Sequence, residues 1–164
     1  MRGQRVFNSR YVDEVKGKET TTPYEKSRLV IQAFNDKDKK HILTQSPTIQ
    51  RLSQRAILAL APSLLKRGIQ VLLRDITQAY VQSTSKLARP IFTRPPRDMV
   101  SDLPPGTILQ VVLPLYGIPE AGAHWYGTYY KHHQVKLNIV QSTYDPCLMV
   151  TNNSEVGPFG VVGL

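Results

Sequence analysis

The first forty residues show a polar–apolar pattern that is typical of β-strands. One β-rich stretch covers residues 6–15 and a second covers residues 27–34, with turn-forming residues at 17–23 between them. Two such stretches around a turn predict a hairpin. We expect this hairpin to be basic, and we expect the charged residues 35–40 that follow it to form a solvated loop.

A helical period begins after Ser46-Pro47, where a side-chain acceptor and a proline favour a helix start. The apolar positions that recur at helical spacing are Ile49, Leu52, Ala56, Leu60 and Leu64. They predict one apolar face. Gly68 predicts a left-handed stop. Pro62 lies inside this helix and removes the hydrogen bond to Leu58, so we expect a kink or a tightened final turn.

The mostly apolar run 69–76, broken by Arg74-Asp75, predicts a buried strand that delivers a carboxylate at its C-terminal end. Residues 90–93 predict a weak strand and residues 107–113 a further one.

Pro119 is expected to begin a second helix that runs to about Leu137. Its predicted face is aromatic and consists of Ala121, Trp125, Tyr129 and His132. Two last strands are predicted at residues 147–151 and 159–164, around a turn at residues 152–154.

The amino-acid composition limits the kinds of partner, compartment and covalent cross-link that we expect for the chain. The chain has 164 residues, and 21 Lys and Arg against 12 Asp and Glu give a formal charge of +9, which favours polyanionic partners. No apolar run approaches the roughly 20 residues that cross a bilayer, so we expect no membrane span. A single cysteine, Cys147, excludes an internal disulfide and fits an intracellular, cytoplasmic or nuclear compartment better than a secreted one.

Asp75 is the strongest candidate for chemistry, because a carboxylate at a strand end suits a hard cation such as Mg²⁺. Tyr80 follows five residues later, where its ring could test a sugar for a 2′-hydroxyl. The alternatives are that Asp75 caps a turn and that Tyr80 is ordinary core. The adjacent His132 and His133 point to different helix faces and are interpreted as surface residues.

Four segments carry a family resemblance. They are Lys26 to Val30, DITQAYVQS at 75–83, PLYGIPEAGAHWY at 114–126 and STYDPCLMV at 142–150. In this order and spacing they resemble the reverse transcriptases of copia-type retrotransposons. The resemblance implies an α+β fold, namely the fingers and a partial palm of a right-hand polymerase, with a mixed or antiparallel sheet and two main helices. Residues 1–67 would be fingers-like, and residues 68–164 would be fingers- and palm-like.

The resemblance also assigns the catalytic position. Asp75 matches the family's first catalytic aspartate, which holds the Mg²⁺ ions of the in-line displacement at phosphorus. The carbonyl of Ile76 would be a further metal ligand. Tyr80 matches the aromatic position that lies under the sugar of the incoming nucleotide and discriminates deoxyribonucleotides from ribonucleotides.

Four further residues would bind the nucleotide. Lys26 and Arg28 match the basic fingers strand that approaches the triphosphate, with a solvated basic strand as the alternative. Tyr116-Gly117 matches the turn before the second palm helix, with a plain tight turn as the alternative. Departures from the family pattern are Glu120 at a usual Gln, Gly122 at a usual Pro and His124 at a usual Ala. They put in doubt the template contacts that this helix would make.

The family's second acidic motif, which contains two adjacent aspartates, does not occur. Asp145 is the last aspartate and precedes Pro146, a pair that matches a family motif and is expected to start a strand through turn chemistry. Because one carboxylate cannot hold two divalent ions, we expect these 164 residues not to polymerise alone. The resemblance implies RNA template, DNA primer and deoxynucleotides as partners, and the last strand is expected to leave an open edge that favours self-association.

Two other hypotheses remain open. A non-catalytic basic module could hold nucleic acid without chemistry. A retroelement remnant without function, or a gene model cut at a frameshift or intron, would give the same sequence.

Overall fold

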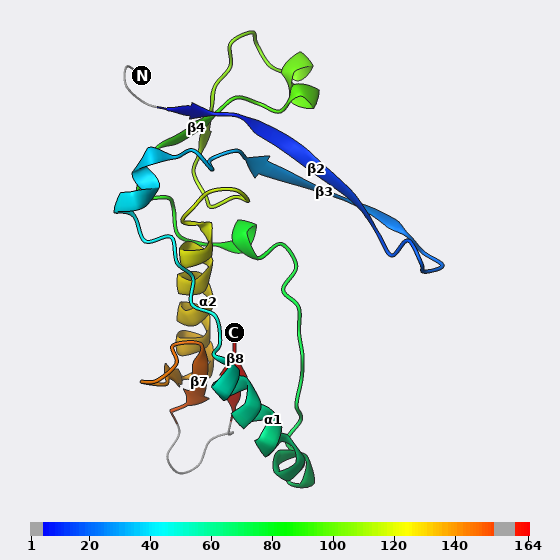
Figure 1. Ribbon diagram of the computed structural model, residues 1–164, viewed down its shortest axis with the longest axis vertical. Coiled ribbons are helices and arrows are strands. Elements are labelled where there is room, and N and C mark those ends of the chain that lie inside the picture. Colours follow the sequence, from blue (N-terminus) through cyan, green and yellow to red (C-terminus); the bar gives the residue numbers. More distant parts are fainter. Residues whose placement is uncertain (1–4, 153–159) are drawn as a thin grey trace. The chain divides into compact units, whose positions relative to one another are not determined.

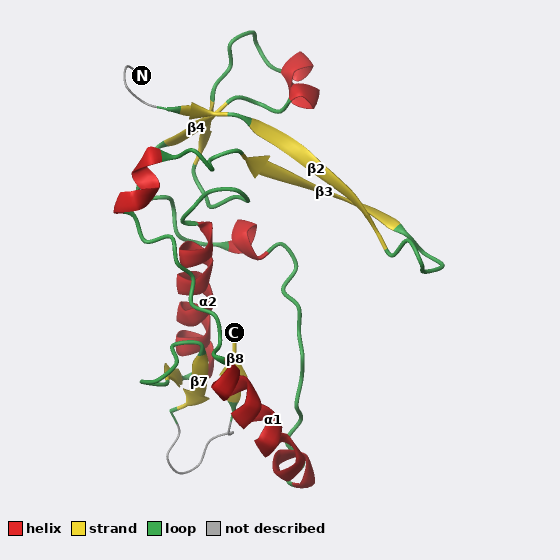
Figure 2. Cartoon of the chain, in the orientation of Figure 1, coloured by secondary structure: helices red, strands yellow, loops and turns green. Residues whose placement is uncertain are grey.

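The computed structural model describes residues 5–152 and 160–164 and has mixed α and β content, as expected for a partial polymerase domain. Residues 1–45 and 78–125 form one compact unit, here unit 1, and residues 46–77 and 126–164 form a second, here unit 2. Figures 1 and 2 show the elements of each unit. The predicted α+β class is confirmed.

Unit 1 contains the predicted hairpin. β2 (Ser9–Lys16) pairs antiparallel with β3 (Tyr24–Ile31) over eight residue pairs, and Figure 1 shows them as a long two-stranded ribbon. Gly17, at φ +65°, opens the turn between them. The predicted first strand is interrupted at Asn8, because β1 (Val6–Phe7) pairs with a different strand.

A second sheet in unit 1 has the order β1-β4-β5. β4 (Ile91–Thr93) pairs parallel with β1 and antiparallel with β5 (Leu109–Val111), so the weak strand predicted at residues 90–93 and the strand predicted at residues 107–113 both form. The core beside them consists of Phe7, Ile31, Ala33, Ile91, Val111, Ile118 and Ala121, with Tyr80, Leu87 and Leu115 packed against it. Short 3₁₀ turns cover Lys37–His41, Ala79–Gln82 and Arg97–Asp102.

In unit 2, α1 (Arg51–Lys66) begins five residues after Ser46, later than predicted. Its end is as predicted, since Gly68 has φ +76°. The amide of Gly68 donates to the Leu65 carbonyl and that of Ile69 to the Leu64 carbonyl, a Schellman ending. Pro62 is inside the helix, and the Arg67 amide donates three residues back to Leu64, which tightens the final turn as expected.

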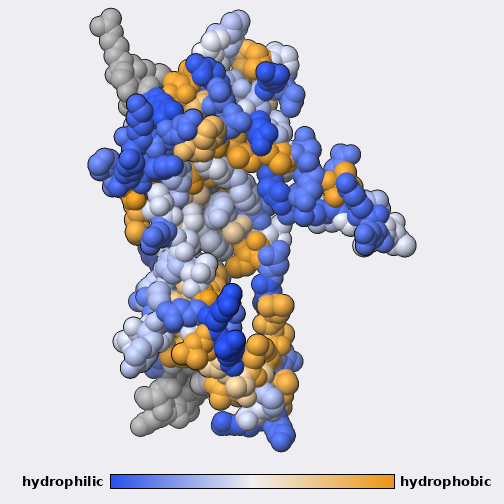
Figure 3. All heavy atoms as spheres, in the orientation of Figure 1, coloured by the Kyte–Doolittle hydropathy of each residue, from blue (hydrophilic) through white to orange (hydrophobic). Residues whose placement is uncertain are grey.

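The predicted apolar face of α1 is wrong. Leu52 and Leu60 are exposed, whereas Ser53 is buried and Ile57 is half-buried. A side chain at Gly163 would meet Ile49 and Ile57, so the packed face is displaced from the predicted one toward β8 (Val161–Gly163). Figure 3 shows apolar side chains on the surface around α1 and the loop that follows it.

The predicted buried strand at residues 69–76 does not form. These residues have no regular secondary structure, as the loop after α1 in Figure 2 shows, and Leu73 is fully exposed. Without a neighbouring strand to accept its ladder of hydrogen bonds, an apolar run does not become a strand.

The described strands of unit 2 form an antiparallel sheet with the order β6-β7-β8. β6 (Ile139–Gln141) was not predicted, whereas β7 (Leu148–Thr151) and β8 were. The predicted turn at residues 152–154 lies largely outside the described residues, as does the start of the last predicted strand. Cys147 and Met149 are fully buried in this sheet, and Asp145 is buried beside it.

The second helix, α2 (Ala121–Leu137), starts two residues after Pro119 and ends at the predicted residue. Asn138 follows in a left-handed conformation, φ +49°, which ends it. Its predicted face is buried only at Ala121, while His132 is exposed and His133 is half-buried with its Nδ1 3.0 Å from the Tyr129 carbonyl. Among the described residues, no helix is long and apolar enough to cross a membrane.

Candidate nucleotide site

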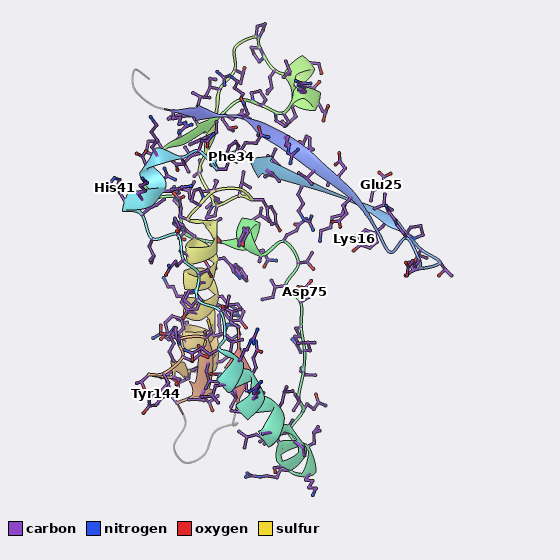
Figure 4. All side chains as sticks on the ribbon, viewed as in Figure 1. Lys16, Glu25, Phe34, His41, Asp75 and Tyr144 are labelled. Carbon is purple, nitrogen blue, oxygen red and sulfur yellow. The ribbon has the colours of Figure 1, made fainter. Side chains whose placement is uncertain are left out.

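The hairpin in unit 1 has two electrostatically different faces. Directly opposed residues of an antiparallel pair share a face, and alternate residues change face. The register therefore places four basic residues and one acid on one face, here the basic face: Arg10, Lys16, Lys26, Arg28 and Glu14. The other face carries Asp13 and Glu25 and no base. Figure 4 shows Lys16 and Glu25 on opposite sides of the ribbon.

Glu14 lies among the bases of the basic face. Its carboxylate is 2.6 Å from Lys16 Nζ and 3.3 Å from Arg28 Nη1, and the hydrogen bond from Lys16 lowers its pKa. One acid against four bases leaves a surplus of positive charge, which attracts phosphates.

Three of the residues implied by the resemblance meet in unit 1. The rings of Tyr80 and Tyr116 lie 5.1 Å apart between centroids at 57°, and the Arg28 guanidinium carbon lies 6.0 Å from the Tyr116 ring centroid. Both tyrosines are half-buried. Tyr80 also packs against the core, which is one of the two alternatives expected for it, and its role at the sugar stays a prediction. These three residues are called the tyrosine cluster.

Gly117 is held against β3. It has φ +84°, and a Cβ there would lie well under 3.0 Å from the Ile31 carbonyl oxygen. The neighbouring Tyr116 carbonyl accepts the Ile31 amide at 2.8 Å, and Val30 and Tyr116 form a parallel bridge. Only glycine lets the turn approach this strand so closely.

Asp75 and Ile76 lie in unit 2, in the loop after α1. Asp75 is exposed, and Figure 4 shows it on that loop. Between it and Tyr80 the chain turns at Gln78, which adopts a left-handed conformation at φ +55°. The expectation of a strand end is therefore wrong, whereas the turn before Tyr80 is present.

The donor set for a metal is small. A carboxylate and a backbone carbonyl are hard oxygen ligands that suit Mg²⁺. Yet the described residues contain no group of three or more His, Cys, Asp or Glu side chains that could hold an ion. Among the residues that the structure describes, one exposed carboxylate and one carbonyl are therefore too few ligands for a two-metal site.

A buried ionic cluster in unit 1, here the Arg89 junction, was missed by the sequence analysis. Arg89 Nε and Nη2 bind both carboxylate oxygens of Glu120 at 2.7 and 2.9 Å, and Nη2 lies 2.5 Å from Asp36 Oδ2. Asp36 is buried, which corrects the expectation of a solvated loop at residues 35–40. Burial acts to raise the pKa of Asp36, but Arg89, the Asp38 amide and the charge of Arg5 together outweigh it, and the pKa is lowered.

Asp145 performs the expected turn chemistry in unit 2 and more. Its Oδ1 accepts the Cys147 amide at 3.0 Å, while Oδ2 accepts the amide of Gln50, the residue that precedes α1, at 2.9 Å. Burial acts to raise the pKa of Asp145, but hydrogen bonds from Ser53, Gln50 and Cys147 outweigh it and the pKa is lowered. One side chain thus starts β7 and caps α1.

Comparison with known proteins gives a family. A family model described as "Reverse transcriptase (RNA-dependent DNA polymerase)" matches residues 2–156, which is nearly the whole chain. No curated protein and no solved structure matches it. The matched range includes the hairpin, the tyrosine cluster and the loop with Asp75. The chain belongs to the reverse transcriptase (RNA-dependent DNA polymerase) family.

Proposed function

We propose that this chain is the nucleotide-handling part of a copia-type retrotransposon reverse transcriptase, and that its 164 residues bind deoxynucleotides and primer–template without extending the primer. The observation that carries this proposal is the convergence of Arg28, Tyr80 and Tyr116 in one unit, beside Gly117. These residues come from separate motifs. Together they offer a cation that can bind phosphate and rings that can contact the sugar or base, and a nucleotide-binding site requires both.

The basic face supplies the second part of the proposal. Lys26 and Arg28 are two residues apart on β3 and share that face, so both can contact one triphosphate once Arg28 releases Glu14. Each charge-assisted contact to a phosphate is worth about 1.5–3 kcal/mol, or roughly a tenfold to hundredfold change in affinity. We therefore expect Arg28→Ala to weaken deoxynucleotide binding by at least about tenfold.

Asp75 would supply one carboxylate for Mg²⁺, with the carbonyl of Ile76 beside it. When bound, the metal would activate the primer hydroxyl and neutralise charge on the phosphates. Because the sequence has no adjacent pair of aspartates, the charge needed for both ions is lacking. We expect no primer extension by this chain.

The test measures binding and extension on one preparation. Binding of dCTP and of a labelled primer–template is titrated at several salt concentrations, and extension is followed with Mg²⁺. Lys18→Ala is the matched control for Lys26→Ala and Arg28→Ala, because Lys18 is a base in the hairpin's exposed turn. Mg²⁺-dependent extension that Asp75→Ala abolishes would refute the inactive part of the proposal. Equal losses in all three variants would refute the site.

The second candidate is a nucleic-acid binder without nucleotide specificity, which the charge surplus of the basic face favours. It predicts salt-dependent binding of primer–template that Tyr80→Ala and Tyr116→Ala leave unchanged, and no selective binding of dCTP. The leading proposal predicts instead that these two variants lose dCTP binding.

A further inference from the structure

The Arg89 junction joins three segments of unit 1 that are distant in sequence. Asp36 follows β3, Glu120 precedes α2, and Arg89 precedes β4. The side chains of Asp36 and Glu120 are only 2% and 7% exposed, and that of Arg89 is 19% exposed. The forked contact with Glu120 fixes the guanidinium plane, because two parallel hydrogen bonds allow it one orientation.

The same three segments carry the tyrosine cluster and Gly117. Arg28 lies on β3, eight residues before Asp36. Tyr116 lies four residues before Glu120, in the turn whose carbonyl accepts the Ile31 amide. Each of these two segments thus has one end in the tyrosine cluster and the other in the Arg89 junction.

Tyr80 lies on the third segment. Between it and Arg89 the chain is anchored at Leu87, whose amide donates to the Val112 carbonyl at 3.0 Å and whose side chain packs against the core. The anchor at Leu87 and the contact of Arg89 with Glu120 therefore fix the segment that follows Tyr80 at two neighbouring points.

Joining segments through two buried carboxylates and one guanidinium is energetically unfavourable in one respect, because all three charged groups lose most of their contact with water. Apolar residues of similar volume often stabilise a fold equally well or better than a buried ion pair. What the forked contact adds is a fixed geometry, since apolar contacts permit sliding and a bidentate pair does not.

We propose that Arg89 is a positioning residue that sets the spacing of Tyr80 and Tyr116, and through it the preference for deoxyribonucleotides over ribonucleotides. This inference rests on the proposed function. Arg89 does not contact the nucleotide in this proposal and acts only through the positions of the two tyrosine rings. Asp36 and Glu120 are its anchors.

The experiment compares dCTP and CTP, which differ only in the 2′-hydroxyl, by equilibrium binding to the full chain. Arg89→Lys keeps the charge and loses the fork. The triple variant Asp36→Asn, Arg89→Met, Glu120→Gln removes all three charges together, so it leaves no buried charge unpaired if the single variant fails to fold. Arg97→Ala, an exposed arginine of the same unit, is the control for losing one positive charge. Circular dichroism and urea unfolding establish that each variant is folded.

We expect the folded Arg89 variants to lose the preference for dCTP over CTP by about fivefold or more, while Arg97→Ala keeps it. A purely stabilising role would weaken both nucleotides equally and leave the ratio unchanged, and that result would overturn the inference alone. If the unaltered chain binds neither nucleotide, the proposed function fails and the role of Arg89 fails with it.

Discussion

Gly117→Ala is the sharpest single perturbation of the candidate site. The new methyl group would point at the Ile31 backbone, too close to its carbonyl oxygen and 3.0 Å from both its carbonyl carbon and Val30 Cγ1. Ile31 is 1% exposed and belongs to the core, so it has little room to move. The obstacle is backbone, which cannot rotate away as a flexible side chain would.

The expected cost has three parts. A left-handed conformation costs a residue with a Cβ about 1–2 kcal/mol. Overpacking against a well-packed neighbour costs about 1–3 kcal/mol. If the turn moves away, the hydrogen bond from the Ile31 amide to Tyr116 is lost, at about 1 kcal/mol. Together they amount to about 3–6 kcal/mol, a large share of the roughly 5–15 kcal/mol that stabilises a typical domain.

Two other glycines separate these contributions. Gly106 has φ +78° with nothing within 4 Å of an added Cβ, so Gly106→Ala reports the conformational cost alone. Gly127 lies inside α2 with open space around it, so Gly127→Ala should stabilise the helix by about 0.5–1 kcal/mol.

The assay is urea unfolding, followed by dCTP binding on whatever remains folded. We expect Gly117→Ala to be the most destabilised of the three variants. Its free energy of unfolding should be lower than that of Gly106→Ala by at least about 2 kcal/mol, because only the methyl group at position 117 contacts backbone atoms of a neighbouring strand. We also expect it to lose dCTP binding, because the Tyr116 ring moves with the turn. Equal destabilisation at the two positions would refute the close approach to Ile31.

Three further predictions concern unit 2. Asp145→Asn should lower the free energy of unfolding at pH 7 by about 1–3 kcal/mol. Since the pKa of Asp145 is lowered in the folded chain, that difference should persist above about pH 4 and shrink as the pH falls further, in urea titrations across pH. Burial raises the pKa of Cys147 to about 11, so iodoacetamide at pH 8 should label it only after unfolding; labelling of the native chain would contradict its burial. Leu73 is fully exposed beside the exposed Leu72, so we expect the chain to self-associate as its concentration rises, and the Leu73→Ser variant to do so less. Sedimentation velocity at several concentrations measures this. A monomer at every concentration would contradict the prediction.

Local signals in the sequence predicted local structure. The hairpin, the end of α1 at Gly68 and the end of α2 at Leu137 were predictable, because turn residues and glycine act within a few positions of themselves. The face of α1 was not, because an apolar period shows which residues could be packed but not which partner covers them. Ile57 lies beside Gly163 of β8, whereas Leu52 and Leu60 are exposed to solvent.

Long-range pairing decided the rest. Residues 69–76 have the composition of a buried strand, yet composition does not supply the neighbouring strand that would complete the ladder. Likewise nothing near Asp36, Arg89 or Glu120 in the sequence indicates that the three meet. Glu120 stood out only as a departure from the family pattern, and the structure gives that departure a partner in Arg89.

The distribution of charge on the hairpin also depends on strand pairing and could not be predicted from the order of residues alone. The hairpin strands and their turn carry nearly as many acids as bases, so a count along the sequence makes this segment almost neutral. The register separates the charges, with four of the five bases on the face of Arg28 and two of the four acids on the opposite face. A shift of the register by one residue would mix the two faces and remove the positive surface. The turn at residues 17–23, which sets the register, is therefore as important for binding a polyanion as the bases themselves.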